Sequence, residues 1–140
     1  MELKYADFGW EMTQKLLAID SPSGYTDKAA AWVKEQFEAL GFAAELTGKG
    51  GVLVDLGGKD AADALLLEAH ADTLGCMVAE IKGNGRLRLT ALGGMNPNNA
   101  EAENVRVYTR CGKVARVDFA CCNGNGNGLF RYRKSDCNLA

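Results

Sequence analysis

The sequence has a single histidine and two prolines, and it has no long run of apolar residues. One histidine excludes every metal site that needs two or more imidazole ligands from this chain. A membrane-spanning helix needs about 20 consecutive apolar residues, so we expect no such helix and no membrane partner. The net charge is −2 and the basic residues are dispersed apart from residues 131–134, which argues against nucleic-acid binding.

The N-terminus carries charges within its first seven residues and has no apolar segment of the kind found in signal peptides. We therefore expect a cytoplasmic protein. The five cysteines are an odd number without zinc-site spacing, and in a reducing compartment they are interpreted as free thiols. They are Cys76, Cys111, Cys121, Cys122 and Cys137.

The first 72 residues read as two helices followed by three strands. Apolar residues recur at helical spacing within residues 6–19, and Thr26 is placed to cap a second helix that Gly41 ends. Residues 42–47 alternate as a strand does, and residues 51–57 are predicted to be a second strand bounded by glycines. Residues 64–71 are apolar on both faces, which predicts a strand covered on both sides, as in an α/β fold.

From residue 76 onward the pattern is that of an all-β segment. Residues 76–82, 86–92 and 104–110 are predicted strands, and the Gly-Asn-Gly sequence at 83–85 predicts a tight turn. Leu87 and Leu89 alternate with polar residues, which predicts that one face of the strand at 86–92 is exposed to solvent (a wet face), as in a small barrel or sandwich. The change of pattern near residue 75 predicts a domain boundary there.

Residues 121–140 are rich in glycine, asparagine and cysteine and show little periodicity. Glycine loses much conformational entropy on folding, and few apolar side chains are present to offset that loss. We therefore interpret residues 121–140 as a disordered or non-native tail. We therefore expect three segments along the chain: the helix-and-strand segment at 1–75, the β-segment at 76–120 and the tail at 121–140.

The candidate site is His70, which follows the predicted buried strand. Asp72 stands two residues later and, with Glu68, would share its face if the strand continued. A metal-bound histidine usually donates its second ring N–H to a carboxylate or carbonyl, and Asp72 is placed for this role. Glu68 is interpreted as a polar contact of the strand end. A histidine satisfied by local hydrogen bonds, with no metal, remains the alternative.

Three stretches carry a resemblance to a known family. They are SPSGYT at 21–26, LLLEAHADTLGCMVAEIKGNGRLRLTALGG at 65–94 and VRVYTRCGK at 105–113, in consistent order. The sequence resembles the M42 metallo-aminopeptidases, the glutamyl and tetrahedral aminopeptidase group, over about residues 8 to 114.

The resemblance implies the N-terminal part of a zinc-peptidase-type α/β sandwich, followed by the start of an inserted small β-barrel domain. It implies two zinc or cobalt ions, a peptide substrate and assembly into homo-oligomers. His70 looks like a metal ligand and Asp72 like the carboxylate that orients it. The family's remaining ligands come later in the chain, and this sequence has no residues that match them.

The expected function is hydrolysis of N-terminal residues from peptides by metal-activated water, in a truncated or frame-shifted chain. The alternative is a catalytically inactive fragment that acts at most as an oligomerisation or binding module. Catalytic zinc needs about three protein ligands, so one histidine would hold an ion weakly at most. The sequence leaves both functions open.

Overall fold

The computed structural model describes residues 3–60, 62–118, 120–121 and 128–131. The chain divides into two compact units, unit 1 at Met1–Thr73 and unit 2 at Leu74–Ala140. Among the residues that the structure describes, neither α-helix combines the length and the apolar character that a membrane crossing requires.

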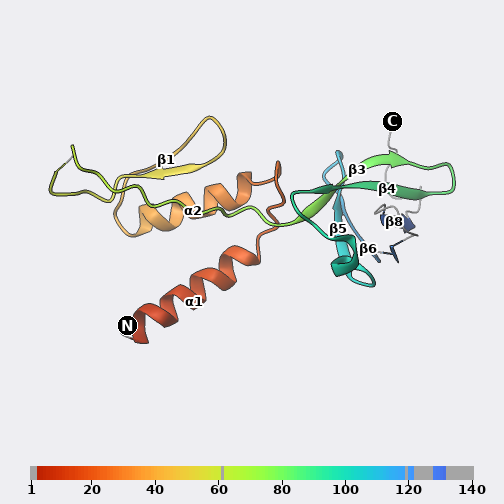
Figure 1. The fold of residues 1–140 in the computed structure, drawn as a ribbon, viewed down its shortest axis with the longest axis horizontal. Helices are drawn as coiled ribbons and strands as arrows, with labels where there is room; N and C mark the ends of the chain where they lie inside the picture. Colours follow the sequence, from red (N-terminus) through yellow and green to blue (C-terminus); the bar gives the residue numbers. More distant parts are fainter. Residues whose placement is uncertain (1–2, 61, 119, 122–127, 132–140) are drawn as a thin grey trace. The chain divides into compact units, whose positions relative to one another are not determined.

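The described residues of unit 1 form two helices and a short hairpin. Helix α1 spans Leu3–Leu17 and helix α2 spans Asp27–Ala39. Strand β1, Ala44–Leu46, pairs antiparallel with β2, Val52–Val54, and both strands contact α2 (Figure 1). These elements confirm the two helices and the first two strands that the sequence predicts, with shorter strands than the pattern suggests.

The two ends of α2 differ in how well the sequence predicted them. Gly41 has φ +90, a left-handed conformation that glycine adopts without strain, and its N–H donates to the carbonyl of Glu38. The predicted C-terminal stop is therefore confirmed. Thr26 occupies the N-cap position, but its side chain makes no capping hydrogen bond, so that prediction is wrong.

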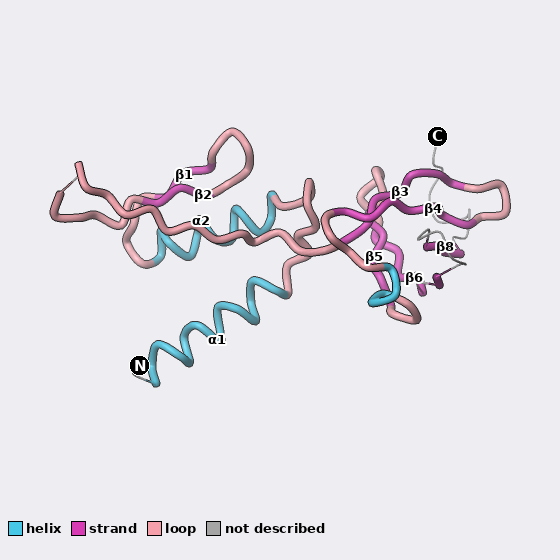
Figure 2. Tube along the Cα trace, in the orientation of Figure 1, coloured by secondary structure: helices cyan, strands magenta, loops and turns pink. Residues whose placement is uncertain are grey.

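The predicted strand at 64–71 is not a strand. Residues 64–70 are loop, drawn without a strand between β2 and the next strand, β3, Gly75–Ile81 (Figure 2). Leu65, Leu66 and Leu67 have exposed fractions of 85%, 74% and 75%. A strand buried on both faces needs neighbouring strands for its backbone and covering layers for its side chains. No described strand pairs with these residues, so the apolar pattern is present without the sheet that it requires.

This exposed leucine segment is expected to promote self-association. Burial of one leucine side chain stabilises an interface by about 1.5–3 kcal/mol. The double substitution Leu65→Lys and Leu67→Lys should therefore weaken self-association at least about tenfold, as measured by sedimentation velocity over a concentration series. The matched control is Leu40→Lys with Leu56→Lys, two leucines that are 58% and 53% exposed outside this segment. Equal weakening by both pairs would contradict the prediction.

Unit 2 is built from β-hairpins, as the sequence predicts. Strand β3 pairs antiparallel with β4, Arg86–Leu92, through a turn in which Gly85 has φ +77. After a short helix at Pro97–Ala100, strand β5, Asn104–Tyr108, pairs with β6, Val114–Asp118. With β7 at Ala120–Cys121 and β8 at Gly128–Arg131, the described strands of unit 2 form a four-stranded sheet, in the order β3-β4-β8-β7, and a separate two-stranded sheet of β5 and β6. The expected barrel is thus not confirmed.

The core of unit 2 lies on one face of β4. Leu87 and Leu89 are 2% and 7% exposed, and the partly buried Cys76, Met95, Ala100, Val105, Val107 and Val117 pack against them. Residues alternate across a strand, so Arg86 and Thr90 are exposed on the opposite face. The predicted wet face of this strand is confirmed.

Part of the predicted tail forms strands. Strand β7 spans Ala120–Cys121, and β8, Gly128–Arg131, pairs with β4 and β7. This differs from the expected lack of regular structure, because the free edge of β4 offers backbone partners to these residues. The other positions of the tail lie outside the described residues. Cys76 is a free thiol as expected, but Cys111 is disulfide-bonded, so the interpretation of five free thiols is wrong.

Candidate functional site

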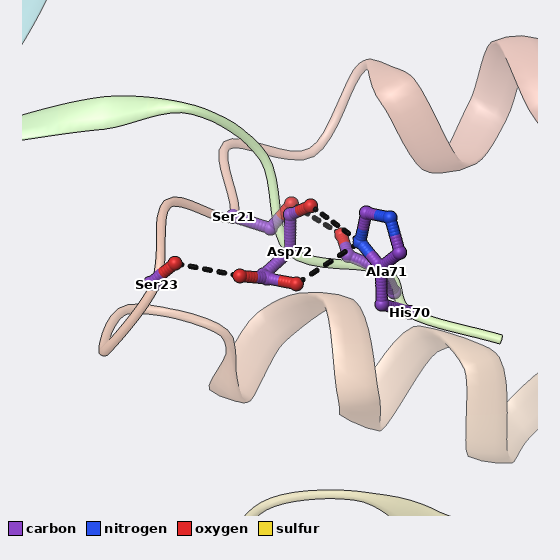
Figure 3. Close-up of polar contacts among 5 residues, drawn as sticks. All are labelled: Ser21, Ser23, His70, Ala71 and Asp72. Atoms are coloured by element: carbon purple, nitrogen blue, oxygen red, sulfur yellow. Dashed lines mark hydrogen bonds and ion pairs between the residues drawn. The ribbon is translucent and has the colours of Figure 1, made fainter. Parts of the chain in front are cut away.

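His70 and Asp72 contact each other in the loop that leads to the end of unit 1. The Nδ1 atom of His70 lies 3.1 Å from the Oδ1 atom of Asp72 and 3.1 Å from the backbone oxygen of Asp72 (Figure 3). The side chain of His70 is 86% exposed and that of Asp72 is 41% exposed. His70 therefore does not point into a packed core.

The two partners of Nδ1 fix the tautomer of a neutral His70. A carbonyl oxygen and a carboxylate oxygen only accept hydrogen bonds, so Nδ1 must carry the proton. The lone pair is then on Nε2, the atom through which a neutral imidazole binds a metal ion. This is the arrangement in which a carboxylate orients a histidine ligand.

The loop between α1 and α2 holds the backbone on both sides of Asp72. Ser21, which is 1% exposed, donates from Oγ to the carbonyl of Ala71 at 2.9 Å. The N–H of Thr73 donates to the carbonyl of Ser21 at 2.8 Å, and Pro22 forms a parallel bridge with Thr73. These contacts join positions about 50 residues apart in the sequence and so fix the backbone at Asp72.

Ser23 binds the second carboxylate oxygen of Asp72. Its Oγ donates to Oδ2 at 2.6 Å (Figure 3). This hydrogen bond is the main reason that the pKa of Asp72 lies below its ordinary value, and the hydrogen bond and charge of His70 act in the same direction. Partial desolvation opposes them. The carboxyl group is therefore held in its charged form.

The described residues fit one ligand of a metal site and not a complete site. A catalytic zinc ion needs about three protein ligands and a water molecule. Among the described residues, no group of three or more histidine, cysteine or acidic side chains could hold a metal ion. The lone pair on Nε2 of His70 fits one metal ligand, and no reaction step through a metal can be built from these residues alone.

The structure places the predicted site residues differently from the pattern that suggested them. His70 and Asp72 are together as expected, but not at the end of a strand, so the argument from alternating faces is wrong. Glu68 is exposed. Sequence reasoning missed Ser23, although it lies in the SPSGYT stretch. The proline and glycine on either side of Ser23, which signal a tight turn, were the available evidence.

Comparisons with known proteins agree on one family. The family model described as M42 glutamyl aminopeptidase matches residues 50–118. A Bacillus subtilis (strain 168) protein named "Putative aminopeptidase YhfE" is 35% identical over 104 residues, which are 74% of this chain and 30% of that protein. The glutamyl aminopeptidase of Lactococcus lactis subsp. cremoris (strain MG1363) is 31% identical over 109 residues, 77% of this chain and 31% of that protein.

A solved structure shares the fold. The structure of PhTET1-12s, a dodecamer in the asymmetric unit, matches with a TM-score of 0.74 at 18% identity, over 92% of this chain and 42% of that one. The likeness supports an α/β fragment with short sheets. The chain spans about 30% of the length of the curated relatives it matches.

Proposed function

Because the chain corresponds to the N-terminal portion of an M42 aminopeptidase, we propose that it carries part of the active site of a metal-dependent aminopeptidase. The reaction is hydrolysis of the N-terminal residue of a peptide. The observation that supports this function is the His70–Asp72 contact, which leaves the lone pair on Nε2 of an exposed imidazole available to a metal ion. Residues 1–75 would belong to the catalytic α/β domain and 76–120 to an inserted β-domain.

The residues of this chain have limited and definite roles in that function. His70 would supply one metal ligand, and Asp72 would hold the imidazole in the tautomer and orientation that binding needs. A divalent ion, zinc or cobalt, would supply the activation of water for attack on the peptide carbonyl. The other ligands and the general base would have to come from outside the described residues.

We also propose a homo-oligomeric state for the whole protein and a peptide as its substrate. The support is the dodecameric assembly of PhTET1-12s and the aminopeptidase names of the relatives. The cytoplasmic location stays a prediction from the sequence.

A chimera tests the proposed function. In the Lactococcus glutamyl aminopeptidase, the matched segment is replaced by the corresponding residues of this chain, and hydrolysis of glutamyl-p-nitroanilide is measured with added Zn²⁺ or Co²⁺. We expect metal-dependent turnover, because the remaining ligands come from the relative. A chimera that folds, as judged by its circular dichroism and thermal unfolding, but shows no turnover would contradict the function.

A second candidate is an inactive module that associates with other subunits. The observation that favours it is the missing ligand set among the described residues. The discriminating assay uses the 140-residue chain itself with aminoacyl-p-nitroanilides and added Zn²⁺ or Co²⁺. Turnover that is lost in His70→Ala would refute the inactive module, whereas absence of turnover would support it for this chain.

A further inference from the structure

Ser23 occupies the corner of a tight turn whose geometry depends on glycine. The N–H of Tyr25 donates to the carbonyl of Pro22 at 2.8 Å, and Gly24 has φ +84. A reversal over four residues with a positive φ at its third position is a type II turn, which favours glycine at that position. The turn therefore presents Ser23 at a fixed place, facing the Asp72 segment (Figure 3).

The two hydrogen bonds to Asp72 act on different oxygens. Ser23 binds Oδ2 and His70 binds Oδ1. Rotation of a carboxylate about its last side-chain bond has a broad, roughly two-fold energy profile, so one hydrogen bond alone sets its plane weakly. With Ser23 on the far oxygen, the plane is set from both ends, and Oδ1 stays directed at Nδ1.

We propose that Ser23 is a positioning residue that acts through Asp72 to hold His70 in its Nδ1–H tautomer, with Nε2 open to a ligand. The relevance of this role to a metal ion rests on the proposed function, but the contact between Ser23, Asp72 and His70 does not. Without the Ser23 hydroxyl, the carboxylate can rotate away from Nδ1, and only the backbone oxygen of Asp72 remains there as an acceptor. With one acceptor in place of two, the imidazole samples both tautomers. Ser23 itself contacts neither metal nor substrate.

The experiment uses the fact that His70 is the only histidine of the chain. Long-range ¹H–¹⁵N spectra of the uniformly labelled 140-residue chain, at a pH where the imidazole is neutral, report its tautomer without assignment. We expect the Nδ1–H form in the wild type and a substantial Nε2–H population in Ser23→Ala. Ser23→Thr, which keeps a hydroxyl, should retain the Nδ1–H form.

Two further variants separate this role from a general effect on folding. Thr13→Ala removes a hydroxyl that donates to the carbonyl of Gly9 on α1, and the Nδ1–H form should persist there. Ser23→Cys keeps the size of the side chain with a weaker donor, and it should raise the Nε2–H population even if Ser23→Ala does not fold. An Nε2–H tautomer in the wild type, or an unchanged tautomer in folded Ser23→Ala or Ser23→Cys, would overturn the proposal.

A Zn²⁺ titration in the same spectra addresses the metal separately. If the proposed function holds, Zn²⁺ shifts the Nε2 resonance of the wild type, and the dissociation constant rises about tenfold in Ser23→Ala. If the tautomer depends on Ser23 but Zn²⁺ has no effect on Nε2, the role of Ser23 stands and the assignment of His70 as a ligand fails. The two results are therefore distinguishable.

Discussion

Replacement of His70 by alanine in the chimera with the Lactococcus enzyme is expected to lower metal-dependent hydrolysis at least about 100-fold. The reason is the loss of one of about three protein ligands that a catalytic zinc ion needs. Asp72→Asn should lower hydrolysis by about 10- to 100-fold, because it removes the charge that orients the imidazole and presents an amide to Ser23. Both effects are measured as kcat/KM for glutamyl-p-nitroanilide at saturating Zn²⁺.

Glu68→Gln is the matched control for these substitutions. Glu68 lies two residues before His70 and is exposed. Its loss of charge should leave kcat/KM within about twofold of the starting chimera, since exposed positions away from such contacts tolerate substitution. If His70→Ala retains the activity of the chimera, or if Glu68→Gln is as damaging as His70→Ala, the assigned roles are wrong.

The second large effect concerns the core of unit 2. Leu87→Ala should lower its free energy of unfolding by about 2–3 kcal/mol. This is the lower part of the range for buried leucines, because the core is small and its neighbours can relax into the space. The measurement is urea-dependent amide exchange at β4. This strand pairs with β3 and β8, which both belong to unit 2, so exchange of its amides reports the unfolding of unit 2.

Leu74→Ala is the matched control in the same unit. Leu74 is 60% exposed, whereas Leu87 is 2% exposed, and its substitution should change stability by less than about 0.5 kcal/mol. Both tryptophans, Trp10 and Trp32, lie in unit 1, so fluorescence follows that unit in the same samples. Equal effects of the two leucine substitutions on β4 exchange would contradict the burial of Leu87.

Local structure was largely predictable from the sequence. The two helices of unit 1, the stop at Gly41, the Gly-Asn-Gly turn and the alternation around Leu87 all follow from interactions within a few residues. Side-chain periodicity and the conformational freedom of glycine act at that range. For the same reason, the sequence could bring His70 and Asp72 together, since they are two residues apart.

The failure at residues 64–71 has the opposite cause. The apolar run of these residues is typical of a strand that is covered on both faces. Whether covering layers and neighbouring strands are present depends on other parts of the chain. A strand forms only where another strand satisfies its N–H and C=O groups, and that is decided by contacts distant in the sequence. The leucines of this segment have the apolar pattern of a buried strand, but they are exposed because no described strand pairs with the segment.

The sequence by itself determined the family resemblance, the candidate histidine and the aspartate beside it. Only the tertiary structure decided that Ser21 and Ser23, about 50 residues earlier, hold the segment that carries them. The physical reason is that a hydrogen bond between remote side chains leaves no period or spacing in the sequence. It exists only because the turn at Gly24 and the bridge between Pro22 and Thr73 place the two segments together.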